Sequence, residues 1–177
     1  ANTVLDLFDM ALDGQDTIYL IARSGHALYR YGMKEQRLVR LQTQSLPFIN
    51  ALTVGPDGKL YGAGEQGVYE VDVLRGTYTR IASLPCSSSG DLVLDGQGGI
   101  LIVLSCSLMG DSLYRIGLDG GNSVKLLDFP EREVYGLSWH GQNLYALSSR
   151  GALYRVNLNT REANWVRVLG SGTYTGM

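Results

Sequence analysis

The chain has 177 residues, including 23 glycines and 11 tyrosines, and its 15 Lys and Arg against 17 Asp and Glu give a net charge of −2. That length fits one ordinary domain, and the near-neutral charge gives no electrostatic basis for binding nucleic acid or an anionic membrane. Since 45% of the residues are hydrophobic, a disordered chain is excluded, and no apolar run approaches the ~20 residues of a membrane-spanning helix.

Short runs of alternating apolar and polar residues follow one another along the chain, beginning with residues 17–22, and each ends at Gly, Asp, Asn or Ser. Such runs are typical of β-strands joined by tight turns. No segment keeps apolar residues at the i, i+3, i+4 and i+7 spacing of an amphipathic helix. The sequence therefore predicts an all-β protein.

A dipeptide of Leu, Ile or Val followed by Tyr recurs along the chain and indicates an internal repeat. Tyr29, Tyr69, Tyr114 and Tyr154 each end such a dipeptide, and they are 40, 45 and 40 residues apart. A period of about 40–45 residues is that of a four-stranded propeller blade. The spacing therefore predicts a β-propeller of four-stranded antiparallel blades.

Four full blades are predicted, over residues 9–46, 47–85, 86–130 and 131–170. We name the strands of a blade a to d in chain order; in the last blade they are residues 135–140, 143–147, 152–157 and 165–169. Gly beside Asp, Asn or Gln marks the a–b turns, because tight hairpins need the positive φ that these residues tolerate best.

The two ends of the chain resemble single strands of a further blade. Residues 1–8 resemble a strand d, and residues 171–177 resemble the start of a strand a. They are predicted to be the terminal strands of an incomplete fifth blade, so that residues 1–177 form one propeller domain or part of one. Unpaired strand edges invite association, which predicts a protein partner, a missing propeller segment or a homo-oligomer.

The segment 136–156 has the pattern Gly-Leu-x-x-x-Gly-x-x-Leu-Tyr-Ala-Leu-x-x-x-Gly-x-Leu-Tyr-Arg-Val. This pattern resembles the repeats of bacterial β-propeller proteins, among them the PQQ-like, NHL-like and gluconolactonase-like superfamilies. The resemblance implies the propeller fold and no particular activity, because propellers serve as enzymes, ligand-binding domains and scaffolds alike.

Candidate functional residues lie at the start of each strand a, which faces the central channel of a propeller. Alignment of the repeats places Asp9, Ala51, Asp91 and Gly136 in one column, and Phe8, Asn50, Gly90 and Tyr135 in the column before it. The resemblance to gluconolactonase-like enzymes implies a metal site, in which Asp9, Asn50 and Asp91 would supply the oxygen ligands that Ca²⁺ prefers. A solvated channel mouth without a cofactor is the favoured alternative, because the three residues fall in two columns and no fourth ligand is evident.

The sequence contains no Gly-x-Ser-x-Gly motif, no phosphate-binding loop and no Cys/His cluster of zinc type, so no catalytic residue is predicted. The favoured function is a non-catalytic binding or scaffolding module. Its d–a and b–c loops are longer and more varied than its a–b turns, and the face that they form is the expected recognition surface. The alternatives are a metal-dependent lactonase-like hydrolase that uses the Ca²⁺ site, and a sugar-binding propeller that uses Phe48, Phe129 and Tyr135.

Cys86 and Cys106 are the two cysteines of the chain. Cys86 precedes strand a of the third blade and Cys106 ends its strand b, so the a–b hairpin returns both to one rim. We predict a disulfide between them, with a buried free thiol at each position as the alternative. Disulfides persist in oxidising compartments, so the protein is expected in the periplasm, at the cell surface or among secreted proteins. Ala1 suits a mature end left by signal-peptide cleavage, and an arbitrary fragment start equally.

Overall fold

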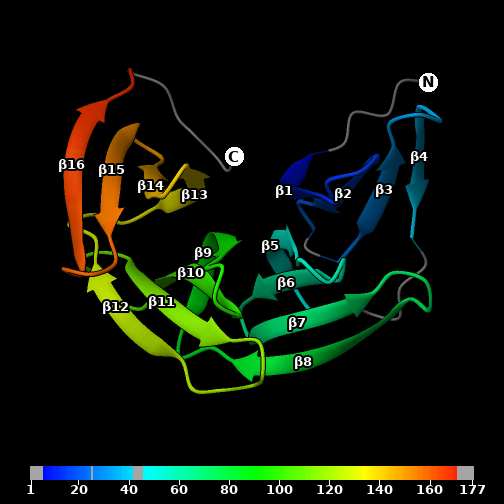
Figure 1. Ribbon diagram of the computed structural model, residues 1–177, viewed down its shortest axis with the longest axis horizontal. Coiled ribbons are helices and arrows are strands. Elements are labelled where there is room, and N and C mark those ends of the chain that lie inside the picture. Colours follow the sequence, from blue (N-terminus) through cyan, green and yellow to red (C-terminus); the bar gives the residue numbers. More distant parts are fainter. Residues whose placement is uncertain (1–5, 25, 42–45, 171–177) are drawn as a thin grey trace.

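A computed structural model describes residues 6–24, 26–41 and 46–170, and within these ranges it contains β-strands and no helix (Figure 1). The strands are β1 (Leu7–Leu12), β2 (Thr17–Ala22), β3 (Leu28–Gly32), β4 (Arg37–Arg40), β5 (Ile49–Val54), β6 (Leu60–Gly64), β7 (Gly67–Asp72), β8 (Thr77–Ser83), β9 (Ser87–Leu94), β10 (Gly99–Ser105), β11 (Ser112–Gly117), β12 (Val124–Asp128), β13 (Val134–His140), β14 (Asn143–Ser148), β15 (Ala152–Asn157) and β16 (Glu162–Val168). None of the described segments is a helix long and apolar enough to cross a membrane.

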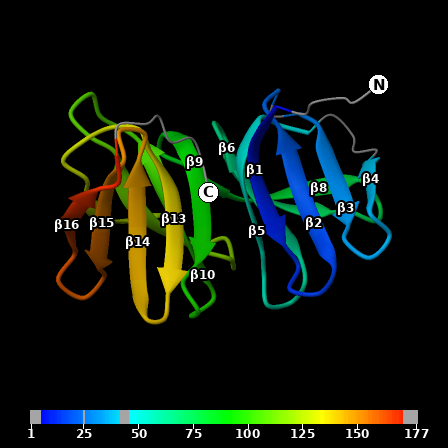
Figure 2. The same ribbon diagram turned by 90° about the horizontal axis from the view of Figure 1, so that it is seen from above.

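Antiparallel pairing joins the strands into four sheets of four consecutive strands each, β1–β4, β5–β8, β9–β12 and β13–β16. The sheets stand around a common axis with β1, β5, β9 and β13 innermost, and the first and last sheets lie at the two ends of an arc (Figure 1). Seen from above, the sheets stand side by side as separate blades (Figure 2). This confirms the predicted all-β propeller with four four-stranded antiparallel blades.

The part of the chain that the structure describes contains no strand of a fifth blade. Leu7 and Phe8 belong to β1, the innermost strand of the first blade, and not to an outer strand of a preceding blade. Leu7 pairs with Ala22 of β2, beyond a register irregularity between Leu7 and Asp9. Residues 1–5 and 171–177, which make up most of the predicted terminal strands, lie outside the described residues.

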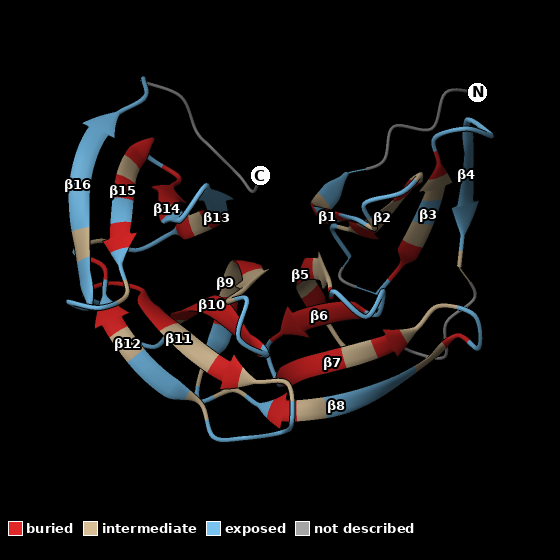
Figure 3. Cartoon of the chain, in the orientation of Figure 1, coloured by how far each residue is buried: buried red, intermediate tan, exposed pale blue. Residues whose placement is uncertain are grey.

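The core lies between the faces of neighbouring blades. In β10, Ile100 and Ile102 pack toward the second blade beside Tyr61, whereas Leu101 and Val103 pack toward the fourth blade. A strand that is covered on both faces is a continuous apolar run, and this explains why residues 100–104 show no alternation. Exposed residues gather instead on the outer strands β4, β8, β12 and β16 (Figure 3).

The a–b turns have the backbone geometry that the sequence predicts. Gly14 has φ of +76° and Gly58 has φ of +77°, in the left-handed region where only glycine is free of steric cost. These turns join innermost strands to their neighbours at the rim opposite the loops that enter each blade.

Gly64 is a position where the fold needs close backbone approach. It ends β6 opposite Ile49, and a Cβ there would overlap the carbonyl oxygen of Phe48. We expect Gly64→Ala to lower the free energy of unfolding by about 1–3 kcal/mol, the usual cost of overpacking, as measured by urea denaturation. The matched control is Gly14→Asn, because nothing lies within 4 Å of a Cβ at Gly14 and Asn tolerates positive φ. Equal losses in the two variants would contradict this prediction.

Candidate functional site

One rim of the arc carries the loops that enter each blade and the loops that join its second and third strands; we call it the loop rim. Among the described residues, several cavities open there. One has a volume of about 410 Å³ and is lined in part by Met109, Phe129 and Pro130. Two others, of about 300 Å³ and about 200 Å³, lie around the propeller axis and share Ser89 and Tyr135.

The cavity of about 300 Å³, which we call the axial cavity, receives residues from all four innermost strands. It is lined by Leu7, Phe8, Arg23, Asn50, Ser89, Gly90 and Tyr135. Four of these residues, Phe8, Asn50, Gly90 and Tyr135, form one of the two columns that alignment of the repeats placed at the start of strand a. Residues of this column line one cavity because equivalent positions of successive blades face the same axis. The other column, with Asp9 and Asp91, does not line it.

Asp9 joins the first blade to the second. Its Oδ1 accepts a hydrogen bond from the backbone N–H of Met10 at 2.7 Å, and its Oδ2 accepts one from Leu52 of β5 at 2.6 Å. Burial raises the pKa of Asp9 to about 7, although these two backbone hydrogen bonds favour the charged form.

Asp91 repeats this arrangement between the third and fourth blades. Its two carboxylate oxygens accept from Leu92 at 2.7 Å and from Leu137 of β13 at 2.6 Å. Burial raises the pKa of Asp91 well above its ordinary value, and the nearby charge of Asp9 raises it further. Both carboxylates thus connect a blade to the backbone of the next one.

Asn50 joins the remaining pair of blades. Its Nδ2 donates to the backbone carbonyl of Ser88 in β9 at 3.0 Å. Asp9, Asn50 and Asp91 are therefore three successive inter-blade contacts, a role that sequence reasoning missed. The recurrence of Asp9 and Asp91 at one position of the repeat was the available signal, since repeated positions usually serve packing.

The calcium site remains a prediction without support from this geometry. Both oxygens of Asp9 and of Asp91 accept backbone hydrogen bonds. Within residues 6–24, 26–41 and 46–170, no three His, Cys, Asp or Glu side chains are grouped so that they could hold a metal ion.

Asp111 is a buried carboxylate that the sequence did not single out. It lies in the loop before β11, where its Oδ2 accepts from Ser89 Oγ at 2.8 Å and from the backbone N–H of Val134 at 3.0 Å. Its main chain is held as well, because its N–H donates to Glu131 and its carbonyl accepts from Phe129. No other blade has a carboxylate at this position, so the repeat gave no signal for it.

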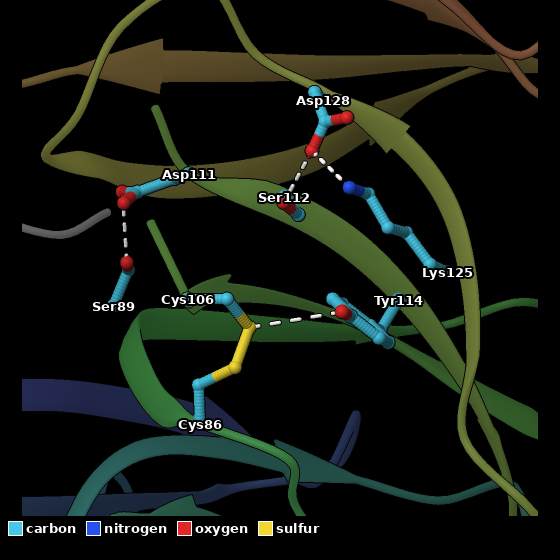
Figure 4. The surroundings of a disulfide bond; sticks show 8 residues. All are labelled: Cys86, Ser89, Cys106, Asp111, Ser112, Tyr114, Lys125 and Asp128. Atoms are coloured by element: carbon cyan, nitrogen blue, oxygen red, sulfur yellow. Dashed lines mark hydrogen bonds and ion pairs between the residues drawn. A yellow bond between two sulfur atoms is a disulfide. The ribbon is translucent and has the colours of Figure 1, made fainter. Parts of the chain in front are cut away.

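Cys86 and Cys106 form the predicted disulfide, which joins the loop before β9 to the end of β10 (Figure 4). Their Cα atoms are 5.1 Å apart, within the usual range for a disulfide. The bond lies at the loop rim, beside the hydroxyl of Tyr114, which Cys106 Sγ approaches to 3.7 Å. The hairpin returns both positions to one rim, as predicted, and a register irregularity between Ile102 and Leu104 aligns them, since Ser105 lies opposite Ser87.

Of the three aromatic residues proposed for sugar binding, Tyr135 alone lines the axial cavity. Phe129 is buried and packs against Tyr154. Phe48 packs edge to face against Phe8 and is not among the residues that line this cavity. The three rings therefore do not form a common platform.

These features define a β-propeller protein whose loop rim carries cavities on and beside the axis. No family model and no curated protein matches the chain. Solved structures do match it, and they are β-propeller proteins.

A chain of the nidogen/laminin complex matches with a TM-score of 0.75 at 14% identity, over 94% of this chain and 65% of that one. The extracellular domain of a B. thetaiotaomicron protein described as a one-component system matches with a TM-score of 0.67 at 22% identity, over 99% of this chain and 24% of that one. Streptogramin B lyase matches with a TM-score of 0.68 at 14% identity, over 94% of this chain and 57% of that one. This chain thus spans a quarter to two thirds of their lengths, and the likeness shows the fold alone.

Proposed function

We propose that this protein is a non-catalytic binding module that recognises a protein partner through its loop rim. The observation that carries the proposal is the loop between β10 and β11. It holds Leu108 and Met109 at 85% and 86% exposure, although both ends of the loop are held in place. The disulfide of Cys106 holds one end, and the hydrogen bonds of Asp111 hold the other.

Exposed apolar side chains on a constrained loop suit a binding role for two reasons. Burial of apolar area on association is favourable, and a loop that is already ordered loses little conformational entropy when it binds. The cavity of about 410 Å³ beside Met109 adds a concave surface with Phe129 and Pro130 in its wall. A partner that inserts an apolar side chain there would also cover Leu108 and Met109.

The structural neighbours are consistent with this class of function. One belongs to the nidogen/laminin complex and another is an extracellular domain. Together with the disulfide, the extracellular neighbour supports a location in the periplasm, at the cell surface or outside the cell.

The first blade offers a second surface for association. On its outer face, Met10 and Leu12 are 50% and 55% exposed, whereas Leu52, the counterpart of Met10 in the second blade, is 3% exposed under its neighbour. In β2 and β3, Leu20 and Tyr29 continue this face, as the strand register shows. A missing propeller segment or a second copy of the chain would cover it as blades cover one another elsewhere in the arc.

The hydrolase alternative gains no specific support from the geometry, so we propose no catalytic residue and no cofactor. A role in sugar binding depends on the axial cavity and is taken up below.

The partner-binding proposal is tested with a double variant, Leu108→Ser with Met109→Ser. The oxidised protein serves as bait for envelope and extracellular extracts, and captured proteins are identified and then titrated as purified partners. We expect the double variant to bind at least tenfold more weakly, a loss typical of hot-spot residues, with an unchanged thermal melting curve because both side chains are exposed.

The matched control is Leu74→Ser. Leu74 is 95% exposed in the turn between β7 and β8, on the opposite rim, and this variant should bind as the wild type does. The proposal is wrong if no purified partner binds, or if the double variant and Leu74→Ser affect binding equally.

A further inference from the structure

The axial cavity and its smaller neighbour together present oxygen atoms that the fold itself leaves unused. Asn50 Oδ1, Ser88 Oγ and Asp111 Oδ1 are buried without a hydrogen-bond partner among the described residues. Asn50 lines the axial cavity, and Ser88 and Asp111 line the smaller one. Buried polar atoms are normally paired, and each unpaired atom is a cost to the folded state.

Two of these groups are held so that the unused atom is fixed in place. The Nδ2 of Asn50 donates to the Ser88 carbonyl at 3.0 Å, which sets the orientation of the amide. The Oδ2 of Asp111 accepts two hydrogen bonds, from Ser89 Oγ and from the N–H of Val134. The Asp111 carboxylate is fully buried and is held in a single orientation beside the smaller cavity, which Asp111 lines.

The chemistry of the unused atoms selects the kind of ligand. An amide oxygen and a carboxylate oxygen only accept hydrogen bonds, so the ligand must donate through O–H or N–H groups. Charges around the cavities are balanced, because Arg23 and Arg132 among the lining residues are matched by Asp111 and Glu133. A ligand with a net charge therefore gains little here.

The walls also offer donors and aromatic carbon. The guanidinium groups of Arg23 and Arg132 and the hydroxyl of Ser105 line the cavities, and each can donate to a ligand oxygen. Phe8 and Tyr135 border the axial cavity from opposite ends of the arc. Hydroxyl groups that both donate and accept, on a carbon ring with an apolar face, match this combination.

We propose that the axial cavity and its smaller neighbour bind a neutral, polyhydroxylated ligand, namely a saccharide unit of one or two rings. A volume of about 300 Å³ lies at the lower end for ligand sites, which suits a ligand of this size. The proposal does not depend on the partner-binding role of Leu108 and Met109, since neither residue lines these two cavities.

The test titrates the intact, oxidised protein with glucose, galactose, mannose, N-acetylglucosamine, maltose and cellobiose, followed by calorimetry and by saturation-transfer NMR. Choline serves as a cationic probe and acetate as an anionic probe. We expect at least one saccharide to bind with a Kd of about 1 mM or tighter, and choline and acetate to bind more weakly.

Two variants test whether the ligand binds in these cavities. Asp111→Asn removes the charge of the fixed acceptor and should weaken saccharide binding at least tenfold. Arg132→Ala, at an exposed residue that does not contribute to the core, should weaken it about fivefold, and it keeps the test valid if Asp111→Asn fails to fold. Arg37→Ala, beside a separate cavity formed by β3 and β4, should bind as the wild type does.

The inference is overturned if none of the six sugars binds at about 10 mM, if choline or acetate binds in their place, or if Arg132→Ala and Arg37→Ala bind equally well. The Leu108→Ser, Met109→Ser variant should bind the saccharide normally. Loss of partner binding without loss of saccharide binding, or the reverse, thus separates the two proposals.

Discussion

Replacing both Cys86 and Cys106 with alanine is expected to lower the free energy of unfolding by about 3 kcal/mol. The disulfide closes a loop with a sequence separation of 20 residues. In the chain-entropy model, a loop of that size restricts the unfolded chain by about 3 kcal/mol. The folded state should change little, because β9 and β10 are also paired by their backbone hydrogen bonds.

Urea denaturation of the oxidised wild type, the reduced wild type and the double variant measures this effect. The reduced wild type and the variant should unfold at similar urea concentrations, both well below the oxidised protein. Reductant should not lower the unfolding midpoint of the double variant, and this controls for other effects of the reagent. Equal midpoints for oxidised and reduced wild type would contradict the prediction.

The second large effect is a loss of stability as the pH rises from about 4 to about 7. Burial raises the pKa of Asp9 from 3.8 to about 7 in the folded state. Between those values the folded protein keeps a proton that the unfolded chain has lost, so stability falls by about 1.4 kcal/mol per pH unit. Asp9 alone corresponds to about 4 kcal/mol over this interval, and the raised pKa of Asp91 acts in the same direction.

Urea denaturation at pH 5, 6, 7 and 8 measures this slope. Asp9→Asn should flatten it, because the amide is neutral at every pH and its oxygen can still accept from the N–H of Leu52. Asp119→Asn, at an exposed turn, is the matched control and should keep the slope of the wild type. Carboxyls such as Asp128, whose pKa is lowered by its hydrogen bond from Lys125, act at more acidic pH, outside this window. Stability that rises from pH 5 to pH 8 in the wild type would contradict the assignment.

The two predictions concern contacts within one blade and contacts between blades. The disulfide acts within the third blade, where it also holds one end of the loop with Leu108 and Met109. Asp9 and Asp91 act between blades, where their carboxylates accept from the backbone of the next sheet. Loss of the disulfide should therefore affect the loop rim through the loop that holds Leu108 and Met109. Loss of the Asp9 or Asp91 hydrogen bonds should affect it through the arrangement of the innermost strands.

Among the candidate site residues, some could be found from the sequence and others could not. Phe8, Asn50, Gly90 and Tyr135 were placed together because equivalent positions in a repeat face the same axis, and they do line one cavity. Asp111 could not be found, because no other blade has a carboxylate at the equivalent position of this loop. Its partners Ser89 and Val134 are 22 and 23 residues away along the chain.

The sequence by itself determined the all-β class, the four blades and the disulfide, because each depends on local alternation, a fixed repeat period or the return of one hairpin to the rim where it began. The tertiary structure decided that Asp9, Asn50 and Asp91 join blades, and that Leu7 and Phe8 extend the first innermost strand. The physical reason is that a carboxylate beside an axis can bind a cation or accept backbone N–H groups equally well. The neighbouring blade decides between these roles, because it supplies the N–H groups of Leu52 and Leu137. These residues are 43 and 46 positions along the chain from Asp9 and Asp91.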